Sequence, residues 1–323
     1  MNLRDLEYLV ALADERHFGR AAARAYVSQP TLSTQIRKLE SELGVDLVER
    51  GSRQVLLTAA GEQVVARARA ILAQADDIRD IARSARDPRA GRLRLGVFPT
   101  LGPYLLPHVV PGLRRRFPDL ELLLTEAKTG ELVAQVHAGA LDAALIALPV
   151  PDEALHAELL WREDFLLAVP ESHRLADPAT PVTSASLAGE ELLLLAEGHC
   201  LRDQALDVCR ATGAGVQSGF QATSLETLRH MVAAGVGTTL LPRLAVSPPT
   251  TNPEGVALRE LGGETPHRDI ALVWRRTTVH GALLTELAEE LRAVPTDLVS
   301  PVPAGSVAEC PAHPRSRAVP GRA

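Results

Sequence analysis

The chain is poor in the features that mark several common protein classes. Three cysteines in 323 residues do not form the disulfide framework of a small secreted domain. No stretch approaches the roughly 18 consecutive apolar residues that a membrane span requires. The N-terminal segment contains scattered acidic residues and no small-residue cleavage site, so we expect no signal peptide and a soluble, cytoplasmic protein without membrane contact. No CxxC pair or other metal-ligand set is visible, so we expect neither metal nor cofactor.

Positive charge is scarce overall but concentrated near the N-terminus. The formal net charge is −6, which by itself does not favour a nucleic-acid partner. Residues 16–53 nevertheless hold seven basic and four acidic side chains, a local charge of +3. Any DNA-binding surface is therefore expected in this N-terminal part of the chain.

Apolar residues at helical spacing predict three short helices within the first 44 residues. Ser28 is a favoured N-cap for the third helix, and Pro30 is tolerated in its first turn. Gly44 is suited to end it. Two short helices joined by a tight turn predict a helix-turn-helix, and the following extended runs predict a hairpin with Arg50 and Arg53 at its tip.

The outer face of the third helix is polar and suits contact with DNA. Hydroxyls and amides can read base edges, whereas cationic side chains bind phosphates or guanine. An ordinary three-helix bundle with a polar outer face is the alternative interpretation. The candidate DNA-binding residues are Ser28, Gln29, Pro30, Thr31, Ser33, Thr34, Gln35, Arg37 and Lys38 on the helix, with Arg50 and Arg53 on the hairpin.

The rest of the chain predicts three further segments. Residues 59–87 form an Ala-rich amphipathic pattern that indicates a linker or dimerisation helix, although one more helix of a single domain would look the same. From 91 to 294, strand-like runs alternate with helical ones, which predicts an α/β domain of about two lobes. Residues 295–323 are rich in proline and are expected to be a disordered tail. Residues 1–58 would then be the winged helix-turn-helix domain.

A second informative stretch, EGHCLRDQALDVC, contains Cys200 and Cys209. His199, Arg202 and the start of a helix lie beside Cys200, and a cation or a helix N-terminus stabilises a thiolate. Nine residues of ideal helix separate the two cysteines by about 13.5 Å, whereas a disulfide needs Cα atoms within about 7 Å. If this segment is helical when reduced, disulfide formation must unwind it. Two unrelated buried cysteines remain the alternative, and Cys310 in the tail is given no role.

The N-terminal residues FGRAAARAYVSQPTLSTQIRKLESELGVDLVER and VLLTAAG resemble the DNA-binding domain of LysR-type transcriptional regulators. Nearly sixty residues match in order. The resemblance implies a winged helix-turn-helix, a dimerising linker helix, and a two-lobed α/β effector domain like those of periplasmic binding proteins. It also implies a homo-oligomer, with a dimer of dimers expected on double-stranded promoter DNA.

The effector region is similar to the OxyR branch, the peroxide sensors of that family. The similarity is carried by GHCLRDQALDVC, ATSLETLRHMVAAGVG and PTLGPYLLPHVVP, and it extends from residue 1 to about 294. It implies that Cys200 is the peroxidatic cysteine and Cys209 the resolving one. It further implies that peroxide and thiolate are held by a set of five residues: Thr100, Thr129, His199, Asp203 and Arg268.

The expected function is a peroxide-sensing regulator of antioxidant genes that is not an enzyme. Hydrogen peroxide would be the effector, with RNA polymerase as a partner and a thiol reductant of thioredoxin or glutaredoxin type resetting the switch. One alternative is a LysR-type regulator that binds a small metabolite between its lobes and has passive cysteines. A thiol peroxidase is a second, but it would give the N-terminal domain no purpose.

Overall fold

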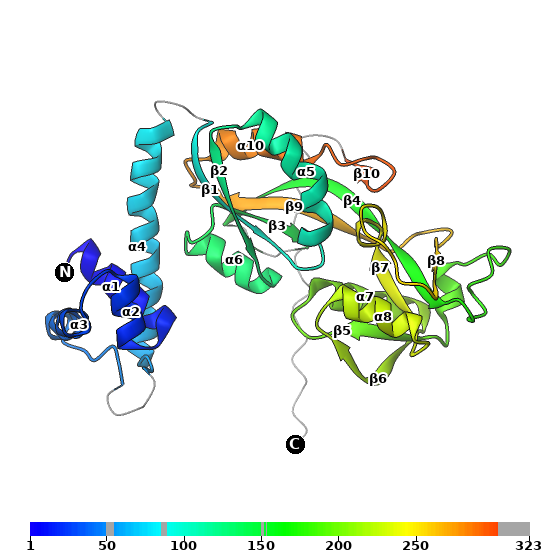
Figure 1. The fold of residues 1–323 in the computed structure, drawn as a ribbon, viewed down its shortest axis with the longest axis horizontal. Coiled ribbons are helices and arrows are strands. Elements are labelled where there is room, and N and C mark those ends of the chain that lie inside the picture. The colour runs from blue at the N-terminus through cyan, green and yellow to red at the C-terminus, as the bar shows by residue number, and fades with distance from the viewer. Residues whose placement is uncertain (50–54, 85–88, 150–151, 153, 303–323) are drawn as a thin grey trace, which may run out of the picture. The chain divides into compact units, whose positions relative to one another are not determined.

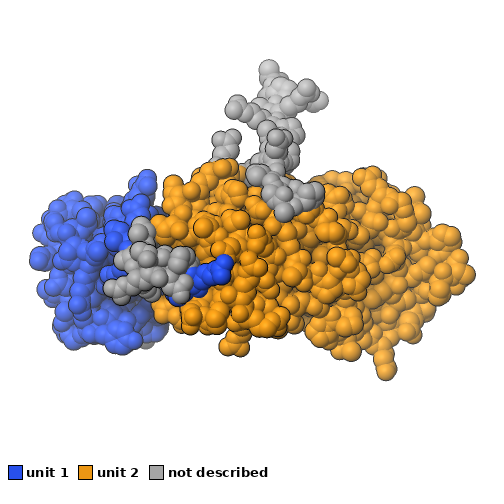
Figure 2. Space-filling view, turned by 90° about the horizontal axis from the view of Figure 1, so that it is seen from above, with its two compact units in different colours: residues 1–91, 134–141 blue, residues 92–133, 142–323 orange. Residues whose placement is uncertain are grey.

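The computed structural model describes residues 1–49, 55–84, 89–149, 152 and 154–302. The chain divides into two compact units, residues 1–91 with 134–141, and residues 92–133 with 142–323 (Figure 2). Within the described residues, no helix is both long and apolar enough to cross a membrane.

The first unit contains a bundle of short helices and a long helix (Figure 1). Asn2 forms a capping box with Asp5 at the start of the first helix, and the imidazole of His17 accepts the Gly19 and Arg20 backbone N–H groups in the first turn of the second. The Ser28 hydroxyl accepts from the Thr31 amide, and Gly44, with φ of 70°, ends the third helix. The elements are α1 (Leu3–Glu15), α2 (Phe18–Arg24), α3 (Gln29–Leu43) and α4 (Ala59–Ser84).

A buried carboxylate joins α3 to the segment that follows it. Glu40 is only 6% exposed, and its Oε1 accepts the backbone N–H groups of Leu47 at 2.9 Å and Val48 at 3.1 Å. Val48 then forms an antiparallel bridge with Leu57. This bridge is the base of the predicted hairpin, whereas its tip with Arg50 and Arg53 lies outside the described residues.

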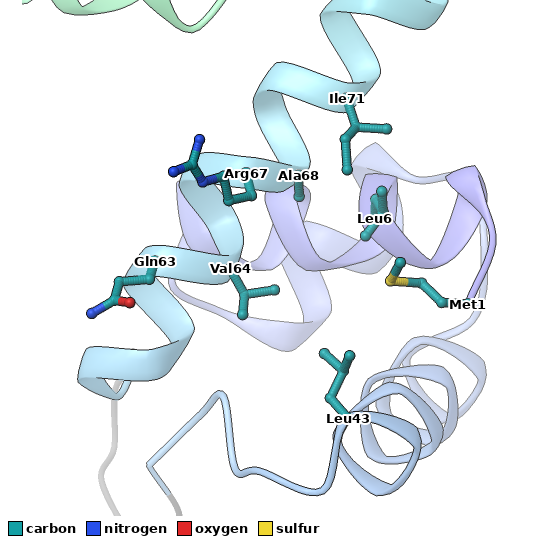
Figure 3. A pocket seen from close by; sticks show the side chains of 8 residues that line it. All are labelled: Met1, Leu6, Leu43, Gln63, Val64, Arg67, Ala68 and Ile71. Carbon is teal, nitrogen blue, oxygen red and sulfur yellow. The ribbon is translucent and has the colours of Figure 1, made fainter.

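An apolar hollow lies on the first unit between α1, α3 and α4 (Figure 3). Leu43 and Ile71 are each 39% exposed there, and Met1 is 58% exposed, so the hollow presents apolar surface to solvent. Its lining residues are Met1, Leu6, Leu43, Gln63, Val64, Arg67, Ala68 and Ile71.

The second unit is an α/β fold with two lobes. The first lobe has a sheet of order β10-β4-β9-β3-β1-β2, and α5 packs with α10 on it (Figure 1). The elements are β1 (Gly91–Val97), α5 (Gly102–Arg116), β2 (Leu120–Glu126), α6 (Thr129–His137), β3 (Ala143–Ala147), β9 (His267–Arg275), α10 (Gly281–Leu291) and β10 (Ser300–Pro301). The division into units assigns Gly91 and the end of α6, from residue 134, to the first unit.

The long strand β4 (Leu155–Pro170) continues from the first lobe into the second. Its first part pairs with β9 and its last part with β7 and β8. A separate parallel pair of strands, β5 and β6, packs against α7, the helix that contains both cysteines. The remaining elements are η1 (Ser184–Leu187), β5 (Glu191–Leu195), α7 (Cys200–Thr212), β6 (Gly215–Ala222), α8 (Leu225–Ala233), β7 (Thr239–Pro242), α9 (Arg243–Val246) and β8 (Val256–Arg259).

The predicted start of the tail at residue 295 is wrong. Leu298 and Val299 are 8% and 6% exposed, and Ser300 and Pro301 pair with β4 at Arg162 and Trp161. Two apolar side chains bury against the sheet here, and the edge position tolerates a proline that cannot donate a ladder hydrogen bond. The effector domain therefore extends to about residue 302, and residues 303–323, including Cys310, lie outside the described residues.

Replacement of Glu40 by alanine should destabilise the N-terminal unit. The substitution leaves two buried backbone N–H groups without this acceptor, at a cost of about 1–3 kcal/mol for each unsatisfied donor. Hydrogen exchange in the full-length protein should show faster exchange of the Leu47 and Val48 amides. Glu42→Ala, which removes an exposed carboxylate from the same helix, is the control. Equal protection in both variants would contradict the assigned role of Glu40.

Candidate functional site: a cysteine at the junction of two lobes

Cys200 is the first residue of α7 and follows directly after the loop that leaves β5. The thiol is free and half-buried. Arg202 donates from its guanidinium to the Leu195 carbonyl at 2.8 Å, which fixes the first turn of α7 against the end of β5. The position at a helix N-terminus places backbone N–H groups near the sulfur, and such groups stabilise a thiolate.

Arg268 is the cation of the site, although it is 68 residues from Cys200 in the sequence. It lies on β9 and is 1% exposed. Its guanidinium donates to Thr100 Oγ1 at 3.0 Å and to the Thr100 carbonyl at 3.0 Å. It also pairs with the Glu163 carboxylate at 2.7 Å, and neither side chain is exposed. Removal of one partner from such a buried pair costs roughly 3–5 kcal/mol, so Arg268 is also structural.

Glu163 and Phe98 complete the surroundings of the guanidinium, and neither residue was predicted from the sequence. The other oxygen of Glu163 accepts the Leu244 backbone N–H at 2.8 Å. The Phe98 ring centroid lies 5.1 Å from the Arg268 guanidinium carbon. Glu163 meets Arg268 because the two residues are direct partners in the pairing of β4 with β9, and only the strand register reveals this.

Thr129 approaches the thiol from the first residue of α6. Its buried hydroxyl makes no hydrogen bond of good geometry within the described part of the chain, yet it lies close enough to the sulfur to favour the thiolate. A buried hydroxyl with unused capacity beside a reactive sulfur can bind a small polar molecule that enters the site.

Opposing effects act on the pKa of Cys200. Burial is the largest, and it raises the pKa of this thiol above its ordinary value. The positive charge of Arg268 is the main opposing effect, followed by the Thr129 hydroxyl, the Leu201 backbone N–H and the Thr100 hydroxyl. Burial and the positive charge of Arg268 therefore act in opposite directions on the ionisation of this thiol.

Three neighbours of Cys200 in the sequence, His199, Arg202 and Asp203, were expected to assist its thiolate. Burial and the nearby Lys128 charge lower the pKa of His199, so its imidazole is neutral at neutral pH. The Arg202 guanidinium binds the Leu195 carbonyl. Asp203 is exposed, and no contact within the described residues is seen to join it to Cys200. The structure brings together Cys200, Thr100, Thr129 and Arg268, with His199 adjacent to the sulfur along the chain.

Cys209 lies near the other end of α7, and the intervening segment is helical as predicted. It is buried, its Sγ donates to the Gly215 carbonyl at 3.7 Å, and burial raises the pKa of its thiol. Nine helical steps place the two cysteines about 13.5 Å apart along the axis, beyond the roughly 7 Å between Cα atoms that a disulfide spans. In this conformation the two thiols cannot form a bond.

The described candidate DNA-binding residues lie on α3 or, in the case of Ser28, at its N-cap, and hydrogen bonds among them order the helix face. The hydroxyls of Ser28 and Thr31 are 2.8 Å apart, and Arg37 donates to Ser33 Oγ at 3.0 Å. Tyr26, in the turn before α3, is 94% exposed and was not predicted from the sequence. The exposed members of the predicted set are Ser28, Gln29, Pro30, Thr31, Thr34, Arg37 and Lys38, whereas Ser33 and Gln35 are half-buried.

Two family models match this chain. Residues 3–62 match the bacterial regulatory helix-turn-helix protein of the lysR family, and residues 86–295 match the LysR substrate binding domain. Together with the fold, these matches define a transcription regulator with an N-terminal DNA-binding domain and a C-terminal effector domain.

Comparison with individual proteins shows which branch of these regulators the chain is similar to. The chain is 50% identical over 293 residues to the DNA-binding transcriptional dual regulator OxyR of Escherichia coli K12, covering 91% of this chain and 95% of that protein. A full-length OxyR variant from Pseudomonas aeruginosa superposes with a TM-score of 0.75 at 38% identity, covering 93% and 98% of the two chains. A cysteine-to-serine OxyR variant from Corynebacterium glutamicum, described as H2O2-bound, gives 0.61 at 34% identity, covering 90% and 93%. The chain belongs to the LysR family of bacterial transcription regulators, and within it to the OxyR branch.

The reactivity of Cys200 should increase with pH. Since the thiolate is the nucleophile and the pKa of this thiol is raised, the ionised fraction grows about tenfold per pH unit until the pKa is reached. Alkylation of the Cys200 peptide by iodoacetamide, followed by mass spectrometry between about pH 6 and 8, should show this slope. A rate independent of pH across that interval would mean that the pKa is depressed and that Arg268 outweighs burial.

Proposed function

We propose that this protein is a cytoplasmic transcription regulator that senses hydrogen peroxide by reversible formation of a Cys200–Cys209 disulfide and controls antioxidant genes. One observation supports this most strongly. A half-buried thiol meets Arg268, Thr100 and Thr129 at one end of α7, while a second thiol occupies the same helix nine residues later. The protein acts as a stoichiometric sensor and not as an enzyme.

In the first step, the Cys200 thiolate attacks one oxygen of hydrogen peroxide. An S–O bond forms, the O–O bond breaks, and the departing hydroxide takes up the proton released by the thiol to give water. The hydroxyls of Thr100 and Thr129 hold the peroxide, with His199 and Asp203 as further members of the predicted pocket. Arg268 stabilises both the thiolate and the departing hydroxide, because preorganised cations act strongly in a dry site.

In the second step, Cys209 attacks the sulfur of the Cys200 sulfenic acid. The S–S bond forms, the S–O bond breaks and a second water leaves, so two thiols are oxidised while one peroxide is reduced. The segment between the cysteines must leave its helical conformation for the sulfurs to meet. Oxidation thereby refolds part of the second lobe, and a thiol reductant of thioredoxin or glutaredoxin type returns the protein to its resting state.

The refolded lobe would act on DNA through a homo-oligomer. The face formed by Ser28, Gln29, Pro30, Thr31, Ser33, Thr34, Gln35, Arg37 and Lys38 binds promoter DNA, assisted by Arg50 and Arg53. The apolar hollow beside α4 (Figure 3) supports dimerisation through this helix, because it exposes Leu43 and Ile71. A dimer of dimers then contacts two parts of a promoter and, when oxidised, RNA polymerase.

Substitution of each cysteine separates the two chemical steps. Cys200→Ser should abolish both sulfenic acid and the peroxide-dependent change in the DNA footprint. Cys209→Ser should still form sulfenic acid but no intramolecular disulfide, which peptide mapping by mass spectrometry detects. Cys310→Ser is the control and should respond as the parent does.

Two outcomes would point to other functions. A footprint that responds to peroxide without Cys200 would contradict the proposal, and a response only to a small metabolite would indicate a ligand-sensing regulator. Sustained consumption of many equivalents of peroxide in the presence of a reductant would instead identify a thiol peroxidase.

A further inference from the structure

Lys128 contacts the loop that carries the sensing cysteine, and the proposed chemistry gives it no role. It follows β2 in the first lobe and immediately precedes Thr129. Its ammonium donates to the Glu197 carbonyl at 2.8 Å. Glu197 belongs to the loop between β5 and α7 in the second lobe, so this hydrogen bond joins the two lobes beside the thiol.

The Lys128 side chain also packs closely against Gly198. A Cβ atom at Gly198 would lie 3.0 Å from Lys128 Cδ and 3.2 Å from its Nζ. Gly198 has a φ of +85°, a conformation that residues with a side chain rarely adopt. The loop is therefore shaped so that the lysine can lie directly across it.

The same ammonium acts electrostatically on the next residue of the loop. Its positive charge contributes to the lowered pKa of His199. Lys128 thus interacts with Glu197, Gly198 and His199 in succession, while its neighbour Thr129 reaches Cys200. Lys128 and Thr129 of the first lobe therefore interact with the four consecutive residues 197–200 of the second lobe.

We propose that Lys128 is a positioning residue that clamps the 197–199 loop and keeps Cys200 in the pocket between the lobes until it has been oxidised. The inference rests on the proposed function. For the disulfide to form, the two sulfurs must come within bonding distance. Either the loop next to Cys200 moves, or α7 unwinds from the end that contains Cys209. A clamp on that loop favours the reaction with peroxide and opposes the withdrawal of Cys200 toward Cys209.

Lys128→Met removes the ammonium donor but keeps a long apolar side chain. We expect slower formation of the Cys200 sulfenic acid and faster closure of the disulfide. Each rate should change by about fivefold, the equivalent of a net hydrogen bond of roughly 1 kcal/mol. Lys128→Arg retains a cationic donor and should restore both rates. Arg92→Met, which removes one exposed positive charge from the same lobe, is the matched control and should change neither.

The two rates can be measured separately in the full-length protein. Sulfenic acid is trapped with a dione probe in the Cys209→Ser background, and disulfide closure is followed by acid quenching, alkylation and mass spectrometry with Cys209 present. A purely structural role of Lys128 would lower both rates together or change neither, and either result would overturn the clamp. If the parent protein forms no Cys200–Cys209 disulfide, the proposed function fails and the clamp with it. If the parent protein forms the disulfide but Lys128→Met changes neither rate, the clamp is overturned and the proposed function stands.

Discussion

The helical geometry of α7 and the geometry of a Cys200–Cys209 disulfide exclude each other, and the rest of the proposed mechanism depends on this constraint. Cys200 and Cys209 belong to a single uninterrupted helix, and a helix of this length holds them about 13.5 Å apart along its axis. A disulfide allows about half that separation between Cα atoms. The backbone hydrogen bonds of α7 and the S–S bond are therefore alternatives, and whichever is present determines how this part of the second lobe is packed. In the function proposed above, disulfide formation would therefore require a change of fold in this segment.

Arg268 explains why the chemistry begins at one end of that helix. Burial opposes ionisation of the Cys200 thiol, so a reactive thiolate needs a cation that is itself held without solvent. Glu163 holds the guanidinium by an ion pair in which neither side chain is exposed, and Thr100 accepts two further hydrogen bonds. The cation is fixed by β4, β9 and the turn after β1, whereas the sulfur is carried by α7. The cation and the reacting sulfur are therefore held by different elements of the domain.

Several features could be predicted from the sequence because they depend on local patterns. Helical spacing and the Ser28 and Gly44 caps placed α3, and the apolar pattern from Ala59 placed α4. The stretch from Cys200 to Cys209 was predicted as a helix for the same reason. The alternation of strand-like and helical runs predicted an α/β effector region, and the structure confirms it.

Other features depend on tertiary contacts and could not be predicted in this way. His199 and Arg202 were expected near the thiolate because they adjoin Cys200 in the sequence, whereas Arg268 was expected only from the family resemblance. The pairing of Arg268 with Glu163 follows from the β4–β9 register. Glu163 and Lys128 could not be predicted as site residues, because a single charged residue has the same sequence pattern whether it lies on the surface or in a site. The tail was placed too early because its proline content hid Leu298 and Val299. The structure shows that these two side chains are buried and that the next two residues pair with β4.

Hydrogen exchange of the α7 amides before and after oxidation tests the central claim most directly. In the reduced protein, the amides of residues 204–212 should be protected by the helical hydrogen bonds of α7. After one equivalent of hydrogen peroxide, peptide mapping should show the Cys200–Cys209 disulfide and loss of protection over much of this segment. The Cys209→Ser variant, oxidised in parallel, should keep its protection. A disulfide-bonded protein in which α7 remains protected along its whole length would contradict the account.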